Sequence, residues 1–205
     1  MATSSRRAGR LSAGAGVLVL LGAAALALLL SSASSSSGAR TGRGFSWLRP
    51  NAGRAAGWAS VTTESSSATL FYPSRWRAIP GDRGTVSVAQ RDRRGLYRAY
   101  LNLTPREGVE SPRGWAAFRT QRNRDEGDRH VGLVAAAEGL QFAGARGSCV
   151  IDDYLSRVGA NPYRELACIV AGPRHTDVFV GATLRADWNR LGPVIERAAS
   201  ALIER

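Results

Sequence analysis

One uncharged stretch, Leu11–Leu30, constrains this chain of 205 residues more than any other feature. It contains eight leucines, and as a helix of roughly 1.5 Å rise per residue it would cover about 30 Å, the hydrocarbon thickness of a bilayer. Arg6, Arg7 and Arg10 stand directly before it, whereas the next charged residue after it is Arg40. The positive-inside rule therefore predicts a single-pass signal anchor whose N-terminus stays in the cytoplasm while the rest of the chain is exported.

A cleaved signal peptide is the competing interpretation of the same stretch. Ser31, Ser32 and Ala33 place small residues where a signal peptidase would cut after Ala33. The hydrophobic stretch is longer than an ordinary signal-peptide core, which favours the uncleaved anchor. Both interpretations place the remaining domain outside the cytoplasm, either on the cell membrane or as a secreted form.

The composition divides the chain into four parts. Residues 1–10 form a basic cytoplasmic N-terminus, and residues 11–30 form the transmembrane helix. Residues 31–44 are rich in serine and glycine, a composition typical of a flexible tether. Residues 45–205 are then one globular domain, which is long enough to bury a core without metal ions.

The basic residues are all arginine: the chain has 28 of them, no lysine and 16 acidic residues, for a net charge of +12. An absence of lysine on this scale is typical of a GC-rich genome and is weak evidence for phosphate binding. The arginines also alternate with acids, as in Arg91–Arg94, which is typical of a solvated surface of mixed sign. We therefore expect no nucleic-acid partner, and we expect the anchored domain to be attracted to anionic lipid headgroups instead.

Alternating β-branched and aromatic residues predict eight strands in the domain. The predicted strands are Ala68–Tyr72, Trp76–Ile79, Thr85–Gln90, Tyr97–Thr104, Val131–Ala137, Ser148–Arg157, Tyr163–Ala171 and Asp177–Arg185. A turn of the sequence GANP, Gly159–Pro162, separates the sixth and seventh, so these two should form an antiparallel hairpin.

Two segments have helical character. The first is predicted to begin with Ser111 as N-cap and Pro112 at the first helical position, and to end near Gly127. The second starts near Asp187 with a short turn, after which Pro193 should open a main helix that continues to the C-terminus. Strands in antiparallel hairpins with separate helices predict an α+β fold in which helices cover an antiparallel β-sheet.

The segment Phe71–Trp76 (FYPSRW), followed by a ladder of hairpins and a final helix led by Trp188, resembles PsbP-like domains such as those of the LpqN type of bacterial envelope protein. The resemblance implies an α/β/α sandwich and a role in binding or assembly rather than catalysis. No functional residues carry over, because the matching positions Tyr72, Pro73, Trp76 and Trp188 are expected in the core. The chain lacks the lipidated cysteine of the LpqN type, which leaves Leu11–Leu30 as the membrane anchor.

Cys149 and Cys168 are the two cysteines of the chain, and they fall on the two strands of the predicted hairpin. In an oxidising extracytoplasmic compartment such a pair predicts a disulfide. Two free buried thiols, a redox pair and half of a metal site are the alternatives. The sequence offers neither CxxC spacing nor a neighbouring histidine in support of the last two.

His130 and His175 are the two histidines, and each is expected at a junction between a loop and a strand. A histidine at such a junction is commonly a solvated surface residue. A metal site would require them to converge with Asp128 or Asp177, and a hydrolase would require a nucleophile beside one imidazole. No Gly-x-Ser-x-Gly nucleophile elbow is present, so we expect no catalytic residue, no metal and no cofactor.

Asp152 and Asp153 are adjacent on a predicted strand and should therefore point to opposite faces of the sheet. That geometry excludes a paired acid/base dyad built from these two. We expect one exposed aspartate and one that is bonded to Arg157 or Arg164.

Trp47 and Trp58 precede the first predicted strand. They are expected either to dock their segment onto the domain or to dip into the membrane interface, and docking is favoured.

These observations predict a membrane-anchored, extracytoplasmic binding or assembly module that contacts a protein or an apolar ligand. The alternative is an envelope enzyme of the hydrolase type that uses His130 or His175.

Overall fold

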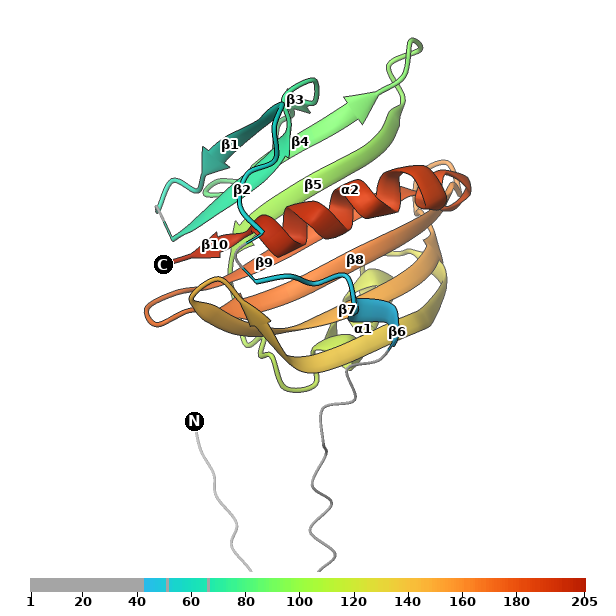
Figure 1. The fold of residues 1–205 in the computed structure, drawn as a ribbon. Helices are drawn as coiled ribbons and strands as arrows, with labels where there is room; N and C mark the ends of the chain where they lie inside the picture. The colour runs from blue at the N-terminus through green and yellow to red at the C-terminus, as the bar shows by residue number, and fades with distance from the viewer. Residues whose placement is uncertain (1–42, 51, 66) are drawn as a thin grey trace, which may run out of the picture. The chain divides into compact units, whose positions relative to one another are not determined.

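The computed structural model describes residues 43–50, 52–65 and 67–205 (Figure 1). Its helical elements are η1 (Arg43–Phe45), α1 (Trp115–Asp125), η2 (Arg185–Asp187) and α2 (Trp188–Ala201). Its strands are β1 (Trp58–Thr62), β2 (Ala68–Pro73), β3 (Arg77–Ala78), β4 (Val86–Arg91), β5 (Tyr97–Pro105), β6 (Arg129–Phe142), β7 (Ala145–Leu155), β8 (Pro162–Ala171), β9 (Thr176–Leu184) and β10 (Ile203–Glu204).

Seven strands form the main sheet in the order β3-β4-β5-β9-β8-β7-β6, and every neighbouring pair is antiparallel. Most neighbouring strands are also consecutive in the chain and are joined by short turns. The exception is the pair β5 and β9, which are adjacent in the sheet although α1, β6, β7 and β8 lie between them in the sequence. The predicted α+β class with an antiparallel sheet is therefore confirmed.

One face of this sheet is covered by α2, by a second, smaller sheet and, at β6, by η1. Helix α2 packs over β8 and β9, and a second sheet of the order β1-β2-β10 lies beside it over β5 (Figure 1). The main core fills the space between these layers, and among its members Trp76, Phe179, Leu191 and Ile195 are almost fully buried. The burial of these side chains supplies most of the apolar stabilisation of the domain.

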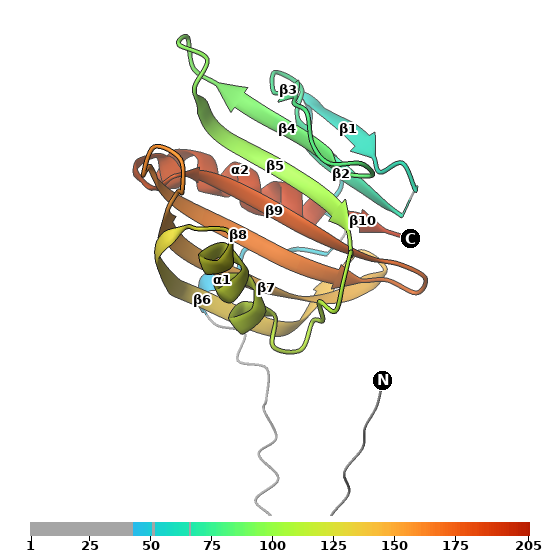
Figure 2. The same ribbon diagram turned by 180° about the vertical axis from the view of Figure 1, so that it is seen from behind.

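The opposite face is covered on one half alone. Helix α1 lies over β6 and β7 (Figure 2), and Trp115 is buried beneath it against Val150, Ala167 and Ile169. On the same face β5 and β9 have no helix above them, and the side chains of Tyr100, Asn102 and Thr104 are half-buried there. The two faces of the sheet thus differ in how completely they are covered.

The hairpin β7–β8 brings the two cysteines directly opposite each other. Cys149 pairs with Cys168 in the register, and their sulfur atoms are 2.09 Å apart, which is the distance of a disulfide. Both side chains are buried in the core on the α2 side of the sheet.

We expect the protein isolated without reductant to carry this bond. Closing a loop of 19 residues would stabilise the fold by about 3 kcal/mol on the chain-entropy model. Intact mass after alkylation should show no modified cysteine until a reductant is added. Alkylation of both thiols in denaturant without reductant would contradict the prediction.

Helix α1 begins later than the sequence predicted. The amide of Arg113 donates to Ser111 Oγ at 3.3 Å, so the serine caps a turn that precedes the helix. The helix itself starts at Trp115, after Gly114 with a φ of 74°. The Gly114 amide donates to Glu138 Oε1 on β6 at 2.8 Å. A contact from a distant strand therefore satisfies the amide at the start of the helix.

Helix α2 also differs from the prediction, because it runs without a break from Trp188 through Pro193. Proline cannot donate the bond that the carbonyl of Asn189 would accept, but both residues are exposed and water can replace it. The helix ends at Ala201 rather than at the C-terminus. The last residues form β10, which pairs Ile203 with Thr69 and extends the small sheet.

Two strand predictions need correction. The stretch Trp76–Ile79 contributes the two-residue strand β3, while Trp76 itself turns into the core, 2% exposed. Strand β1 was not predicted, and it begins at Trp58. Trp58 and Trp47 are both half-buried and pack against the main core, so their segment docks onto the domain as expected.

The predicted membrane helix Leu11–Leu30 and most of the predicted tether lie outside the described residues. Among the residues that are described, no helix is long and apolar enough to cross a membrane.

Candidate functional site: a groove beside helix α1

A row of four side chains crosses the sheet on the face that carries α1. Tyr100 on β5 pairs with Ala182 on β9, which pairs with Glu165 on β8, which pairs with Asp152 on β7. Paired residues on neighbouring strands point to the same face, so all four lie on the side of α1. Two of the four are carboxylates with almost no exposure.

Helix α1 provides a polar partner for each of these carboxylates. The Arg119 guanidinium donates twice to Glu165, from Nε to Oε1 at 2.6 Å and from Nη2 to Oε2 at 2.9 Å. One helical turn later, Asn123 Nδ2 donates to Asp152 Oδ2 at 3.1 Å. The bidentate ion pair between Arg119 and Glu165 holds the helix at a fixed position along the strands.

Asp152 is the less well compensated of the two acids. Burial, and then the charge of Glu165 opposite it, raise the pKa of Asp152 to about 8. Its Oδ1 atom is buried and has no hydrogen-bond partner among the described residues. The side chain of Asp152 is therefore protonated at neutral pH, and it lies beside Glu165, which the Arg119 guanidinium holds.

Two tyrosines continue the polar layer toward solvent. The Tyr100 and Tyr154 hydroxyls are 3.4 Å apart, and the ring of Tyr163 stacks on that of Tyr154 with centroids 5.9 Å apart. Burial is the largest cause that raises the pKa of both Tyr100 and Tyr154. Both hydroxyls thus remain neutral and can donate hydrogen bonds.

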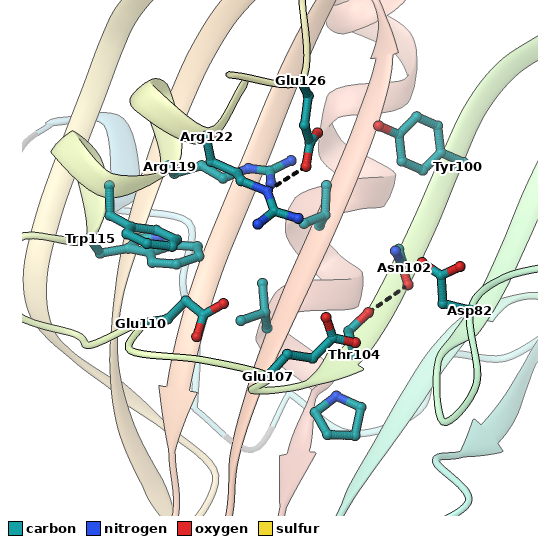
Figure 3. A pocket seen from close by; sticks show the side chains of 14 residues that line it. Asp82, Tyr100, Asn102, Thr104, Glu107, Glu110, Trp115, Arg119, Arg122 and Glu126 are labelled. Carbon is teal, nitrogen blue, oxygen red and sulfur yellow. Dashed lines mark hydrogen bonds and ion pairs between the residues drawn. The ribbon is translucent and has the colours of Figure 1, made fainter. Parts of the chain in front are cut away.

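The uncovered half of the sheet and the side of α1 enclose a groove of about 280 Å³. Figure 3 shows its two walls, with Trp115, Arg119 and Arg122 on the helix and Tyr100 and Thr104 on the sheet. A second hollow of about 560 Å³ extends past Tyr163 to the β7–β8 turn. The two share Tyr100 and Glu126, so they adjoin along the edge of α1.

The sequence prediction for the aspartate pair was half right. Asp153 does point to the opposite face and accepts two hydrogen bonds from Arg164, at 2.7 and 2.8 Å. Asp152, however, is buried rather than exposed. Its true neighbour, Glu165, could have been found from the sequence: pairing Cys149 with Cys168 fixes a register that also places residue 152 opposite residue 165.

The structure does not bring the two histidines together. His130 lies near the start of β6 and His175 in the β8–β9 turn, at opposite ends of β8, and both are exposed. Neither imidazole lines the groove, and neither forms a side-chain hydrogen bond with another described residue. The described ranges also contain no cluster of three or more His, Cys, Asp or Glu side chains arranged to hold a metal ion.

A second buried carboxyl pair lies outside the groove, where the C-terminal strand meets the main sheet. Asp177 at the start of β9 and Glu204 on β10 are 0% and 5% exposed, and Ser67 Oγ donates to Asp177 Oδ1 at 3.0 Å. Burial, and then the charge of Asp177, raise the pKa of Glu204 to about 9. This pair was not expected from the sequence, because β10 itself was not.

No family model and no curated protein sequence matches the chain. Among solved structures, it is similar to the cyanobacterial PsbP of Synechocystis, with 18% identity over 74% of this chain and 94% of that one and a TM-score of 0.53. It also matches the Ran-binding protein Mog1p of Saccharomyces cerevisiae (11% identity, 70% and 86% covered, TM-score 0.46). LpqN of Mycobacterium tuberculosis, involved in cell envelope biogenesis, matches with 14% identity, 71% and 88% covered, and a TM-score of 0.42. The likeness to the cyanobacterial protein confirms the predicted resemblance at the level of the fold: the chain has a PsbP-like α+β fold.

Proposed function

We propose that the chain is an extracytoplasmic binding module, held at the cell membrane by Leu11–Leu30, which contacts a partner through the groove beside α1. The observation that carries the proposal is the unequal covering of the main sheet. One face is closed by α2 and the small sheet, whereas on the other α1 leaves β5 and β9 open. An uncovered sheet face next to a helix is a common place for a partner to bind.

The shape of the open face favours a polypeptide over a small apolar molecule. The two adjoining hollows form a long, open depression with polar side chains such as Asn102 and Thr104 on its floor. Exposed apolar side chains lie toward both ends: Val109 in the β5–α1 loop is 90% exposed, and Val158 in the β7–β8 turn is 76% exposed. A segment of extended chain or a helix would cover both.

Filling the groove tests this proposal. In Thr104→Trp, the indole would occupy the groove floor, and the substitution would remove the 3.0 Å hydroxyl contact between Thr104 and Thr85. Thr62→Trp is the matched control, because Thr62 makes the same 3.0 Å contact with Thr69 on the small sheet, away from the groove. We expect proteins that co-purify with the detergent-solubilised wild-type chain to be retained by Thr62→Trp and lost from Thr104→Trp.

A further inference from the structure

The groove reverses the charge balance of the chain. Arginines outnumber acidic residues 28 to 16 in the sequence, but the two hollows are lined by three arginines, Arg119, Arg122 and Arg157. The acidic residues that line them are twice as many: Asp82, Glu107, Glu110, Asp125, Glu126 and Asp128. A negative depression on a positive molecule concentrates cationic groups and repels anionic ones.

Two of the three arginines are already neutralised inside the domain. Arg119 is held by the buried Glu165, and Arg122 forms an ion pair with Glu126 at 2.5 Å, which Figure 3 shows at the mouth of the groove. The charge of Arg119 is therefore not free to pair with a ligand, and the charge of the more exposed Arg122 is offset by that of Glu126. An anionic lipid headgroup or a phosphate would meet no free guanidinium on the helix side of this groove.

The acids at the other end of the groove are available. Glu107 and Glu110, in the loop between β5 and α1, form no ion pair with any described residue. The Glu110 carboxylate accepts the Gly108 amide at 2.7 Å, which steadies it at the rim. Val109 lies between them in the sequence with its side chain in solvent. The same loop also carries Arg106 and Arg113, and Arg106 Nη1 donates to the Glu110 carbonyl at 3.5 Å. Neither of these arginines lines the hollows, whereas Glu107 and Glu110 do, so the loop presents two carboxylates to the groove.

We propose that the occupant of the groove is a basic, partly apolar segment of a partner polypeptide. Its arginine or lysine side chains would pair with Glu107 and Glu110. The apolar parts of the segment would cover Val109 and two aromatic side chains of the groove, Tyr100 on the sheet and Phe118 on α1. This inference rests on the proposed function and adds the chemistry of the partner. Charge complementarity at such a surface contributes mainly to specificity and to the rate of association.

The probe for this proposal is a fluorescent peptide of alternating arginine and valine, with a peptide of alternating glutamate and valine as its counterpart. Fluorescence anisotropy with the detergent-solubilised full chain should give a dissociation constant at least about tenfold tighter for the basic peptide. The chain has a positive net charge, so non-specific electrostatic attraction would favour the acidic peptide. Tighter binding of the basic peptide therefore requires a locally negative surface. Raising the salt concentration should weaken the binding.

The double variant Glu107→Gln/Glu110→Gln removes both charges and keeps the acceptor for the Gly108 amide. We expect it to weaken binding of the basic peptide by about twofold to twenty-fivefold, because each partly exposed ion pair contributes a factor of about 1.4 to 5. The matched control is Glu64→Gln/Asp92→Asn. Like the test variant, it removes two negative charges: Glu64 is exposed and has no ion pair with another described residue, and Asp92 accepts backbone amides. Both residues lie outside the groove, so this control should bind the basic peptide as tightly as the wild type does.

Three results would overturn the proposal. Equal affinity for the two peptides would show that the groove does not select basic segments, and equal weakening by the two double variants would place the contact elsewhere. A dimer of the wild type that the Glu107→Gln/Glu110→Gln variant abolishes would identify the occupant as a second copy of this chain. Co-purification that depends on Thr104, combined with equal binding of the two peptides, would support the groove as the binding site and reject a basic segment as its occupant.

Discussion

Replacing Arg119 with methionine should lower the free energy of unfolding by about 3–5 kcal/mol. The methionine keeps much of the apolar stem, but it leaves the Glu165 carboxylate, 1% exposed, without its counter-charge and directly opposite Asp152. A buried charge that has lost its partner is far more costly than the pair was favourable. Urea denaturation of the detergent-solubilised full chain, followed by tryptophan fluorescence, should show the shift in midpoint.

The matched control lies one turn further along the same helix. Arg122 pairs with Glu126, but these side chains are 54% and 49% exposed, so Arg122→Met should cost less than about 1 kcal/mol. Adding Glu165→Gln to Arg119→Met should restore part of the lost stability, because the orphaned charge is removed. Equal losses for Arg119→Met and Arg122→Met would contradict the structural role assigned to the buried pair.

The protein should be more stable at pH 5.5 than at pH 8.5, by on the order of 3 kcal/mol for each of two buried carboxyl groups. In the unfolded chain a carboxyl loses its proton near pH 4, whereas folding raises the pKa of Asp152 to about 8 and that of Glu204 to about 9. Between these values the folded state binds more protons than the unfolded state. The contribution of these two groups to the free energy of unfolding is therefore fully present below about pH 4. It is lost as the pH rises through 8 and 9.

Neutral replacements at these positions should flatten the dependence on pH. Glu204→Gln should be more stable than the wild type at pH 8.5, with the difference shrinking toward pH 5.5, and Asp152→Asn should behave in the same way. Glu64→Gln, at an exposed position, should follow the wild-type curve. Urea midpoints at several pH values measure this effect. Parallel curves for the wild type and Glu204→Gln would contradict the buried protonated pair.

Local sequence signals were sufficient for the elements whose stability is mainly local. The GANP turn predicted the β7–β8 hairpin, and the structure pairs Leu155 with Pro162 on either side of it. A helix was predicted from near Asp187 onward, and in the structure Leu191, Ile195 and Ala198 form its buried face. In each case the residues that define the element lie within one turn or one helical face.

The features that the sequence analysis missed depend on residues far apart in the chain. The start of α1 is determined by Glu138, which is on β6, and β10 exists because Ile203 and Glu204 meet β2. The acids of the groove come from separate loops and from the end of α1, so their convergence follows from the folded sheet. In the row of side chains on the α1 face, the register of the β7–β8 hairpin predicts one contact, that between Asp152 and Glu165.

The comparison of Thr104→Trp with Thr62→Trp tests the central claim most directly. If the open half of the sheet is the contact surface, the partners that co-purify with the wild type and with Thr62→Trp will be absent from Thr104→Trp, while all three chains unfold at similar urea concentrations. If Thr104→Trp retains the same partners as the wild type, or if no partner distinguishes the wild type from an anchor-only control, the groove beside α1 is not the binding site of this domain.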